Sequence, residues 1–118
     1  MRPVRSVLLS LLALAVILAA GPAFADPVTK VDSKRVCMVN NTVFPKDQIP
    51  VEVDGKTYFG CCEMCKGRLA KDASARTAVD PVTGKPVDKA TAVIGAKPDG
   101  EVLYFESQKT FDEYAKRT

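Results

Sequence analysis

The chain has 118 residues, of which 47% are hydrophobic and 26% charged, with 17 Lys and Arg against 14 Asp and Glu. This balance is ordinary for a small globular protein, and it excludes an acidic disordered tail and a strongly basic nucleic-acid binder. The chain contains no His, which excludes His-dependent nucleophilic catalysis, His-ligated zinc catalysis and a histidine pH switch.

Residues 1–25 have the features of a secretory signal peptide. Arg2 and Arg5 precede an apolar stretch over residues 7–20, and the segment closes on Ala23-Phe24-Ala25. The stretch is short for a membrane span, and small residues two apart are typical of a cleavage site. An uncleaved membrane anchor is the alternative. We expect export to the periplasm and, after cleavage, a 93-residue domain of net charge +1 without membrane contact.

The first half of the exported part predicts one hairpin followed by one helix. Residues 26–35 are polar and predict a flexible N-terminal segment. Residues 49–61 alternate apolar side chains on both sides of Asp54-Gly55, which predicts a β-hairpin because both turn positions need a positive φ. Residues 62–71 carry apolar side chains at helical spacing and predict a short helix.

The second half predicts two strands and a further helix. Residues 73–79 fit either a continued helix or a link into a strand, and residues 80–86 are turn-forming. Residues 91–94 and 102–105 predict strands, after which Ser107 can cap a helix that runs through Lys116. We assign the aromatic side chains of these elements to the core: Tyr58, Phe59, Tyr104, Phe105, Phe111 and Tyr114.

These elements repeat the order of turn, hairpin and helix. Alignment of the two copies at an offset of 45 residues sets the cysteines at positions 61, 62 and 65 against Glu106, Ser107 and Thr110. It also sets Cys37 against Thr83. The pattern predicts an α+β fold of two small tandem ββα units over residues 36–78 and 79–118. Each unit is too small to hold a full core alone, so we expect them to share one. Chance resemblance between two ββα patterns is the alternative.

The four cysteines are the candidate metal ligands: Cys37, Cys61, Cys65 and Cys62. Cys61 and Cys65 are four residues apart at the predicted start of a helix, so their sulfurs can converge, and a helix N-terminus favours the thiolate. Cys37 in a distant turn would close the site. Three soft sulfurs without imidazole suit one soft metal ion, Cu(I) or Zn(II). Cys62, Glu63 and water are candidates for a fourth ligand, and Met38 and Met64 could add thioethers.

The spacing Cys-x23-Cys-x3-Cys on a turn, hairpin and helix resembles the TRASH domain, a treble-clef-like module associated with heavy-metal trafficking, resistance and sensing. The segment Asp80-Pro81-Val82-Thr83-Gly84, with the later Tyr104-Phe105-Glu106-Ser107, resembles the related YHS domain. This chain has Thr83, Glu106 and Thr110 where that family has cysteines, and Lys85 where it has Met. The resemblance therefore implies a zinc-ribbon-like scaffold in which residues 36–78 bind metal and residues 79–118 lack the cysteine ligands.

The resemblance also implies a role in copper or other heavy-metal handling, delivery or resistance. A metal transporter or metal-acceptor protein would then be the partner, and we expect neither an enzyme nor a nucleic-acid binder. Two alternatives use the same cysteines. Disulfides persist in exported proteins, so the chain could be a disulfide-stapled structural or interaction module with a vestigial metal scaffold. Cys62-x-x-Cys65 also matches the spacing of thiol redox motifs.

Overall fold

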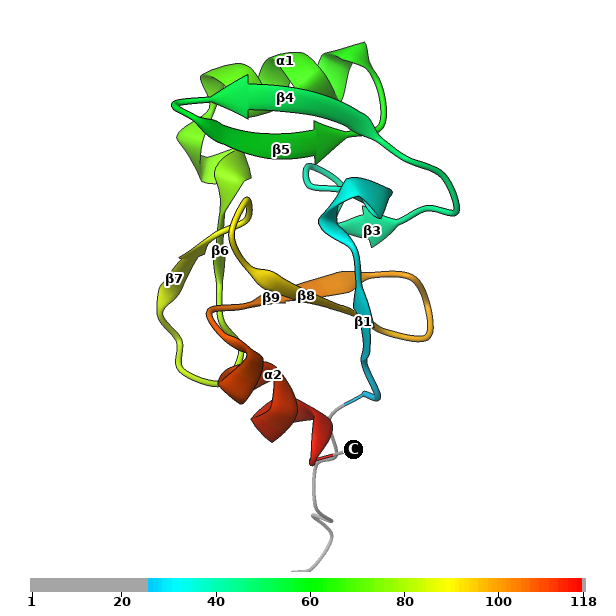
Figure 1. Cartoon of the computed structure of the whole chain (residues 1–118), viewed down its shortest axis with the longest axis vertical. Helices are drawn as coiled ribbons and strands as arrows, with labels where there is room; N and C mark the ends of the chain where they lie inside the picture. Colours follow the sequence, from blue (N-terminus) through cyan, green and yellow to red (C-terminus); the bar gives the residue numbers. More distant parts are fainter. Residues whose placement is uncertain (1–25, 118) are drawn as a thin grey trace, which may run out of the picture.

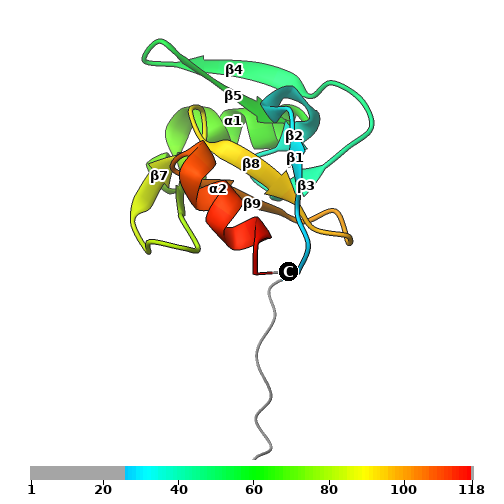
Figure 2. The same cartoon turned by 60° about the horizontal axis from the view of Figure 1, so that its bottom comes forward.

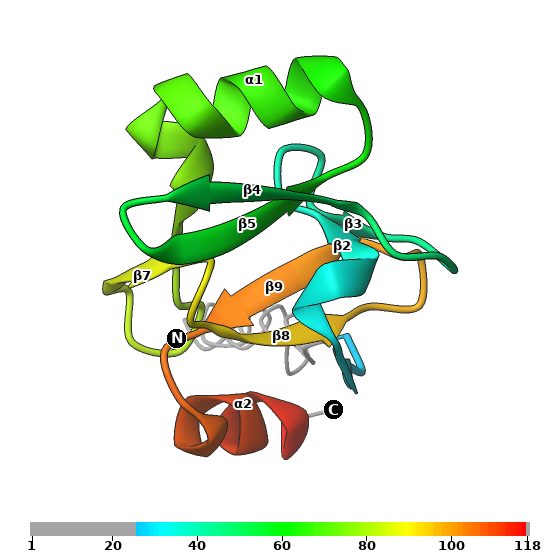
Figure 3. The same cartoon turned by 45° about the horizontal axis from the view of Figure 1, so that its top comes forward.

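A computed structural model of the chain describes residues 26–117, and the predicted signal peptide lies outside these residues. Within these residues, small antiparallel sheets and two α-helices form an α+β fold, as the sequence predicts. Figure 3 shows the elements in layers, with helix α1 over the hairpin β4–β5, the strands β8 and β9 below it, and helix α2 beneath them. The elements in chain order are β1 (Thr29–Val31), η2 (Ser33–Arg35), β2 (Val36–Cys37), β3 (Thr42–Val43), β4 (Ile49–Val53), β5 (Lys56–Gly60), α1 (Glu63–Lys71), η3 (Ala73–Arg76), β6 (Thr77–Val79), β7 (Pro86–Asp88), β8 (Val93–Ala96), β9 (Val102–Phe105) and α2 (Gln108–Ala115).

The predicted hairpin and the helix after it are confirmed. Strands β4 and β5 pair antiparallel, and both turn residues have positive φ, 51° at Asp54 and 81° at Gly55. Helix α1 begins after Cys62 and packs on this hairpin (Figure 1). Leu69, on the inner face of the helix, is fully buried. The apolar face of α1 therefore fixes the helix against the hairpin, which sets where its first residues lie.

The second hairpin belongs to a three-stranded sheet in the order β1–β8–β9. Helix α2 lies across one face of β8 and β9 (Figure 2). Its N-cap is Ser107, whose Oγ accepts from the amide of Thr110, as the sequence predicts. The Phe105 ring is fully buried and packs edge-on against Phe111, with ring centroids 5.4 Å apart. Aromatic packing therefore attaches α2 to the sheet.

The polar start of the described chain is part of the fold. The sequence predicts that residues 26–35 are flexible, whereas Thr29–Val31 forms the edge strand β1 along β8, and η2 follows. The two-residue strands β2 and β3 form a further small hairpin. That hairpin contacts the β8–β9 connection, because the amide of Val43 donates to the carbonyl of Gly100 at 2.9 Å. These pairings connect the N-terminal half of the described chain to the C-terminal half.

In the described part of the chain a hairpin followed by a helix occurs twice, as β4–β5–α1 and β8–β9–α2. The two hairpins differ in their sheets, since β4–β5 stands alone while β8–β9 pairs with β1. Because the sheets differ, the internal repeat of two ββα units stays a prediction. Buried side chains of both halves form one cluster that includes Val36, Leu69 and Tyr104. Within residues 26–117, neither helix has the length and apolar character needed to cross a membrane.

Candidate metal centre

Three of the four predicted ligands meet at one point. The Sγ atoms of Cys37, Cys61 and Cys65 all lie within 4.8 Å of one another, and those of Cys61 and Cys65 are 3.8 Å apart. All four cysteines are free thiols. Cys37 comes from the end of β2, Cys61 from the bend after β5 and Cys65 from the first turn of α1. Residues separated by 24 and 28 positions in the chain thus share one site.

Cys37 is held by a tight turn between β2 and β3. The amide of Asn41 donates to the Cys37 carbonyl at 2.7 Å, and Asn41 has a left-handed φ of 55° that asparagine tolerates. The amide of Met38 donates to the carbonyl of Phe59 at 2.8 Å, which attaches the turn to β5. The turn therefore presents a fully buried Cys37 sulfur to the end of the first hairpin.

Cys61 and Cys65 approach each other because β5 ends close to α1. Gly60 precedes Cys61, and a Cβ placed on Gly60 would lie 3.0 Å from the Cβ of Cys65. The side-chain amide of Asn40 donates to the sulfur of Cys61 at 3.5 Å. Cys61 lies before the N-cap, outside the helix, so the strand–helix junction brings it to Cys65.

The sulfur spacing fits a thiolate metal site. Metal–sulfur bonds of about 2.3 Å place sulfurs about 3.8 Å apart in a tetrahedral site and about 4.0 Å apart in a trigonal one. The Cys61–Cys65 separation of 3.8 Å matches these values, and the 4.8 Å limit for the whole group requires only a small contraction. Three thiolates suit soft ions in preference to Mg²⁺ or Ca²⁺, which prefer oxygen.

The three thiols differ in acidity. Burial raises the pKa of Cys37, but the amides of Asn40 and Val39 and the neighbouring Cys61 lower it by more, so the net shift is downward. Burial, supported by the adjacent thiols, raises the pKa of Cys65 to about 12. The pKa of Cys61 is raised too, mainly by its hydrogen bond with Cys37. Metal binding must therefore displace the proton of Cys65, whose pKa lies far above neutrality.

Cys62 lies outside this group of three sulfurs. It is the N-cap of α1 and is exposed, and its side chain makes no capping hydrogen bond. The amide and thiol of Cys65 lower its pKa all the same. Met38 is fully buried in the core, and Met64 is 82% exposed on the helix surface. Cys62 is thus an accessible thiol beside the site, while the two methionines lie in opposite environments.

Sequence reasoning missed the polar residues that support the Cys37 turn. Lys89 Nζ donates to the carbonyl of Met38 at 2.7 Å and to Asn41 Oδ1 at 3.0 Å. Tyr104 Oη donates to the same Oδ1 atom at 2.9 Å. Asn41 could have been noticed as a turn former four residues after Cys37. Nothing in the sequence marks Lys89 as buried, since it follows Asp88 and lies between two predicted turn and strand segments.

In the second half, the residues aligned with the three converging cysteines, Thr83, Glu106 and Thr110, also gather at one place, around a carboxylate. The Asp80 side chain is fully buried and accepts from Thr110 Oγ1 at 2.7 Å and from the amide of Glu106 at 2.8 Å. Thr83 Oγ1 donates to Glu106 Oε2 at 2.6 Å, and the Thr83 amide donates to Asp80. Hydrogen bonds to Asp80 thus hold together the turn, β9 and α2.

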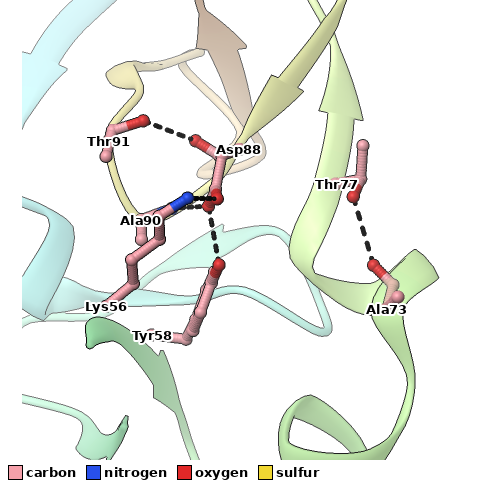
Figure 4. A network of polar contacts seen from close by, with 7 residues as sticks. All are labelled: Lys56, Tyr58, Ala73, Thr77, Asp88, Ala90 and Thr91. Carbon is pink, nitrogen blue, oxygen red and sulfur yellow. Dashed lines mark hydrogen bonds and ion pairs between the residues drawn. The ribbon is translucent and has the colours of Figure 1, made fainter. Parts of the chain in front are cut away.

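A second aspartate connects the first hairpin to the strand β7. Asp88 accepts from Tyr58 Oη at 2.8 Å, pairs with Lys56 Nζ at 2.7 Å, and accepts from the amide of Ala90 (Figure 4). Burial and the Asp88 contact raise the pKa of Tyr58 to about 12, so this phenol stays protonated and donates. Asp80 and Asp88 each accept from the backbone amide two residues further along the chain, at Val82 and Ala90, and so stabilise turns.

No protein family, curated protein or solved structure matches this chain. The chemistry of the site therefore rests on its own geometry, and the TRASH and YHS resemblance stays a prediction.

Proposed function

We propose that this protein binds one soft metal ion through Cys37, Cys61 and Cys65. The observation that carries the proposal is the convergence of three free sulfurs within 4.8 Å, from three separate elements. Two of them, Cys37 and Cys65, are buried, and a cluster of free thiols that is largely shielded from water is well suited to hold a thiophilic ion. Cu(I) is satisfied by three sulfurs, whereas Zn(II) would take Cys62 or water as a fourth ligand.

We further propose that the protein acts in the periplasm in heavy-metal handling, as a carrier, a buffer or a resistance protein. The signal-peptide pattern of residues 1–25 and the TRASH and YHS resemblance support this role. The exposed Cys62 beside the buried sulfurs would give a metal transporter or acceptor protein access to the ion. The absence of His from the chain is consistent with a thiolate-only site.

The decisive experiment is intact-mass spectrometry of the protein isolated from the periplasm, under non-denaturing and then denaturing conditions. One metal ion per chain with four reduced thiols supports the proposal, and the metal's mass identifies it. Two disulfides without metal would exclude it and favour the stapled interaction module. A matched chain with Ser at positions 37, 61 and 65 should carry no metal, because neutral hydroxyls replace the soft thiolates.

Localisation needs its own measurement. Release of the protein by osmotic shock, with a mass that lacks residues 1–25, would support export. A full-length mass in the membrane fraction would instead identify the segment as an uncleaved anchor. Neither result depends on whether the cysteines bind metal, so the two parts of the proposal can fail separately.

A further inference from the structure

Lys89 is a buried cation whose contacts are all to neutral groups. Only 5% of the surface of this residue is exposed to solvent, although charged side chains are rarely buried without a partner of opposite charge. Its Nζ donates to the Met38 carbonyl and to the Asn41 side-chain carbonyl, and it lies 5.0 Å from the centroid of the Tyr104 ring. Of the ion pairs formed within residues 26–117, none includes Lys89. Its positive charge therefore lacks a carboxylate partner.

The ammonium group lies under the turn that carries Cys37. Met38 directly follows Cys37, and Asn41 closes the same turn through its bond to the Cys37 carbonyl. Burial is the main influence on Lys89 and lowers its pKa to about 8. Of the charged groups that act on it, Cys37 favours the ammonium form and Arg68 on α1 opposes it. The contacts with Met38 and Asn41 thus place the ammonium group against the turn of a candidate metal ligand, Cys37.

Metal binding increases the negative charge of this site. Three thiols lose their protons when the ion binds, so a monovalent ion leaves two net negative charges and a divalent ion leaves one. A buried positive charge beside the turn stabilises both complexes relative to the protonated, metal-free site. It stabilises the complex of the monovalent ion more, because that complex carries the larger negative charge.

We propose that Lys89 is the counter-cation of the three-thiolate centre and favours a monovalent soft metal over a divalent one. This inference rests on the proposed function and adds a selectivity to it. Lys89 makes no contact with the ion in this proposal. It is a positioning and charge-balancing residue that acts through the turn of Cys37.

The test compares the affinities for Cu(I) and Zn(II), measured under reducing conditions by competition with chelators of known affinity. All chains carry Cys62→Ser, so that neither ion can recruit a fourth thiolate. The variants are Lys89→Met, which removes the charge, Lys89→Gln, which removes the charge but keeps an N–H donor, and Lys89→Arg, which keeps the charge. Lys66→Met is the matched control, because Lys66 is an exposed lysine on α1.

We expect Lys89→Met and Lys89→Gln to weaken Cu(I) binding on the order of tenfold more than Zn(II) binding. Lys89→Arg and Lys66→Met should keep the ratio of the parent chain. A loss equal for both metals would show a merely structural role, and an unchanged ratio in both neutral variants would exclude the counter-charge. If the neutral variants do not fold, a shifted ratio in Lys89→Arg would overturn the proposal and a preserved ratio would support it. Failure of the parent chain to bind either metal would instead overturn the proposed function.

Discussion

The α-carbon of Gly60 faces the side chain of Cys65 at the junction of β5 and α1, where a Cβ on Gly60 would lie 3.0 Å from the Cβ of Cys65. The backbone carbon of Cys65 and the amide nitrogen of Lys66 would both lie 3.3 Å from it. Most of these neighbours are backbone atoms, which cannot move aside without shifting the helix. Glycine at this position therefore allows the strand to end against the helix, and this contact brings Cys61 to Cys65.

Gly60→Ala should separate the two cysteines. We expect the variant to lose stability by about 1–3 kcal/mol and to bind metal at least tenfold more weakly, because the overpacked junction moves α1. Gly67→Ala is the matched control, since a Cβ at Gly67 on the same helix meets nothing within 4 Å. That control should be more stable by about 0.5–1 kcal/mol, through helix propensity, with unchanged metal affinity. Chemical denaturation and a metal titration check both, and an unperturbed Gly60→Ala site would contradict this account.

The cysteines should differ in importance according to where the fold places them. Single Cys→Ser changes at Cys37, Cys61 and Cys65 should each weaken metal binding severely, because each removes one of three convergent sulfurs. Cys62→Ser should cost less for Cu(I), since Cys62 is an exposed N-cap outside the group, and more for Zn(II) if it is the fourth ligand. Affinities are measured under reducing conditions. Equal, small losses in all four variants would show that the cysteines form no common site.

Phe105→Ala should destabilise the whole domain. The ring is fully buried and contacts both aromatic side chains of α2, Phe111 at 5.4 Å and Tyr114 at 5.5 Å between centroids. Its loss should lower the free energy of unfolding by about 3 kcal/mol or more. Val79→Ala, at a residue that is 62% exposed, should change it by less than about 0.5 kcal/mol. Thermal unfolding of the metal-free chains distinguishes the two, and similar melting temperatures would contradict the prediction.

The second half should not take part in metal binding. Thr83→Ala removes the hydroxyl that bonds to Glu106 on the surface, so it should leave the metal stoichiometry at its original value. Thr110→Ala removes a buried hydrogen bond to Asp80 and should cost about 1–3 kcal/mol of stability, again without loss of metal from the folded protein. Metal analysis of the folded variants checks this. Loss of metal from either one with the fold intact would mean that the site lies elsewhere.

The local elements were predictable because their signals are local. Asp54-Gly55 predicts its hairpin through two positive φ angles, and Ser107 predicts its helix through one capping bond. The strands β1, β2, β3, β6 and β7 have only two or three residues each, and their pairing partners are chosen by the tertiary fold. Cysteine spacing predicted the three sulfurs that meet. It could not predict Lys89, whose contact with Met38 spans 51 positions in the chain.

Asp80 should make the metal-free protein sensitive to acid. Burial raises the pKa of this carboxyl, but donors from Glu106, Thr110, Val82 and Thr83 lower it by more, so its pKa in the folded protein is below the ordinary value of an aspartate. A group whose folded pKa is depressed contributes stability above its unfolded pKa and loses that contribution as the pH falls through the folded value. Unfolding free energy should therefore fall as the pH drops below about 4. The pKa values of Asp72 and Asp88 are also lowered, so both carboxyls add to this loss of stability in acid.

Asp80→Asn isolates this contribution. The variant should be less stable at pH 7 by about 3 kcal/mol, because an amide N–H₂ group faces donors that need an acceptor. The difference from the parent chain should shrink as the pH is lowered below about 4, because Asp80 then takes up a proton in the unfolded chain while it stays ionised in the folded protein. Denaturant unfolding of the metal-free chains at pH 7, 5 and 3 measures it. A difference that is the same at all three values would show that Asp80 is not the titrating group, and a stable Asp80→Asn chain at pH 7 would show that its hydrogen bonds do not hold the second unit together.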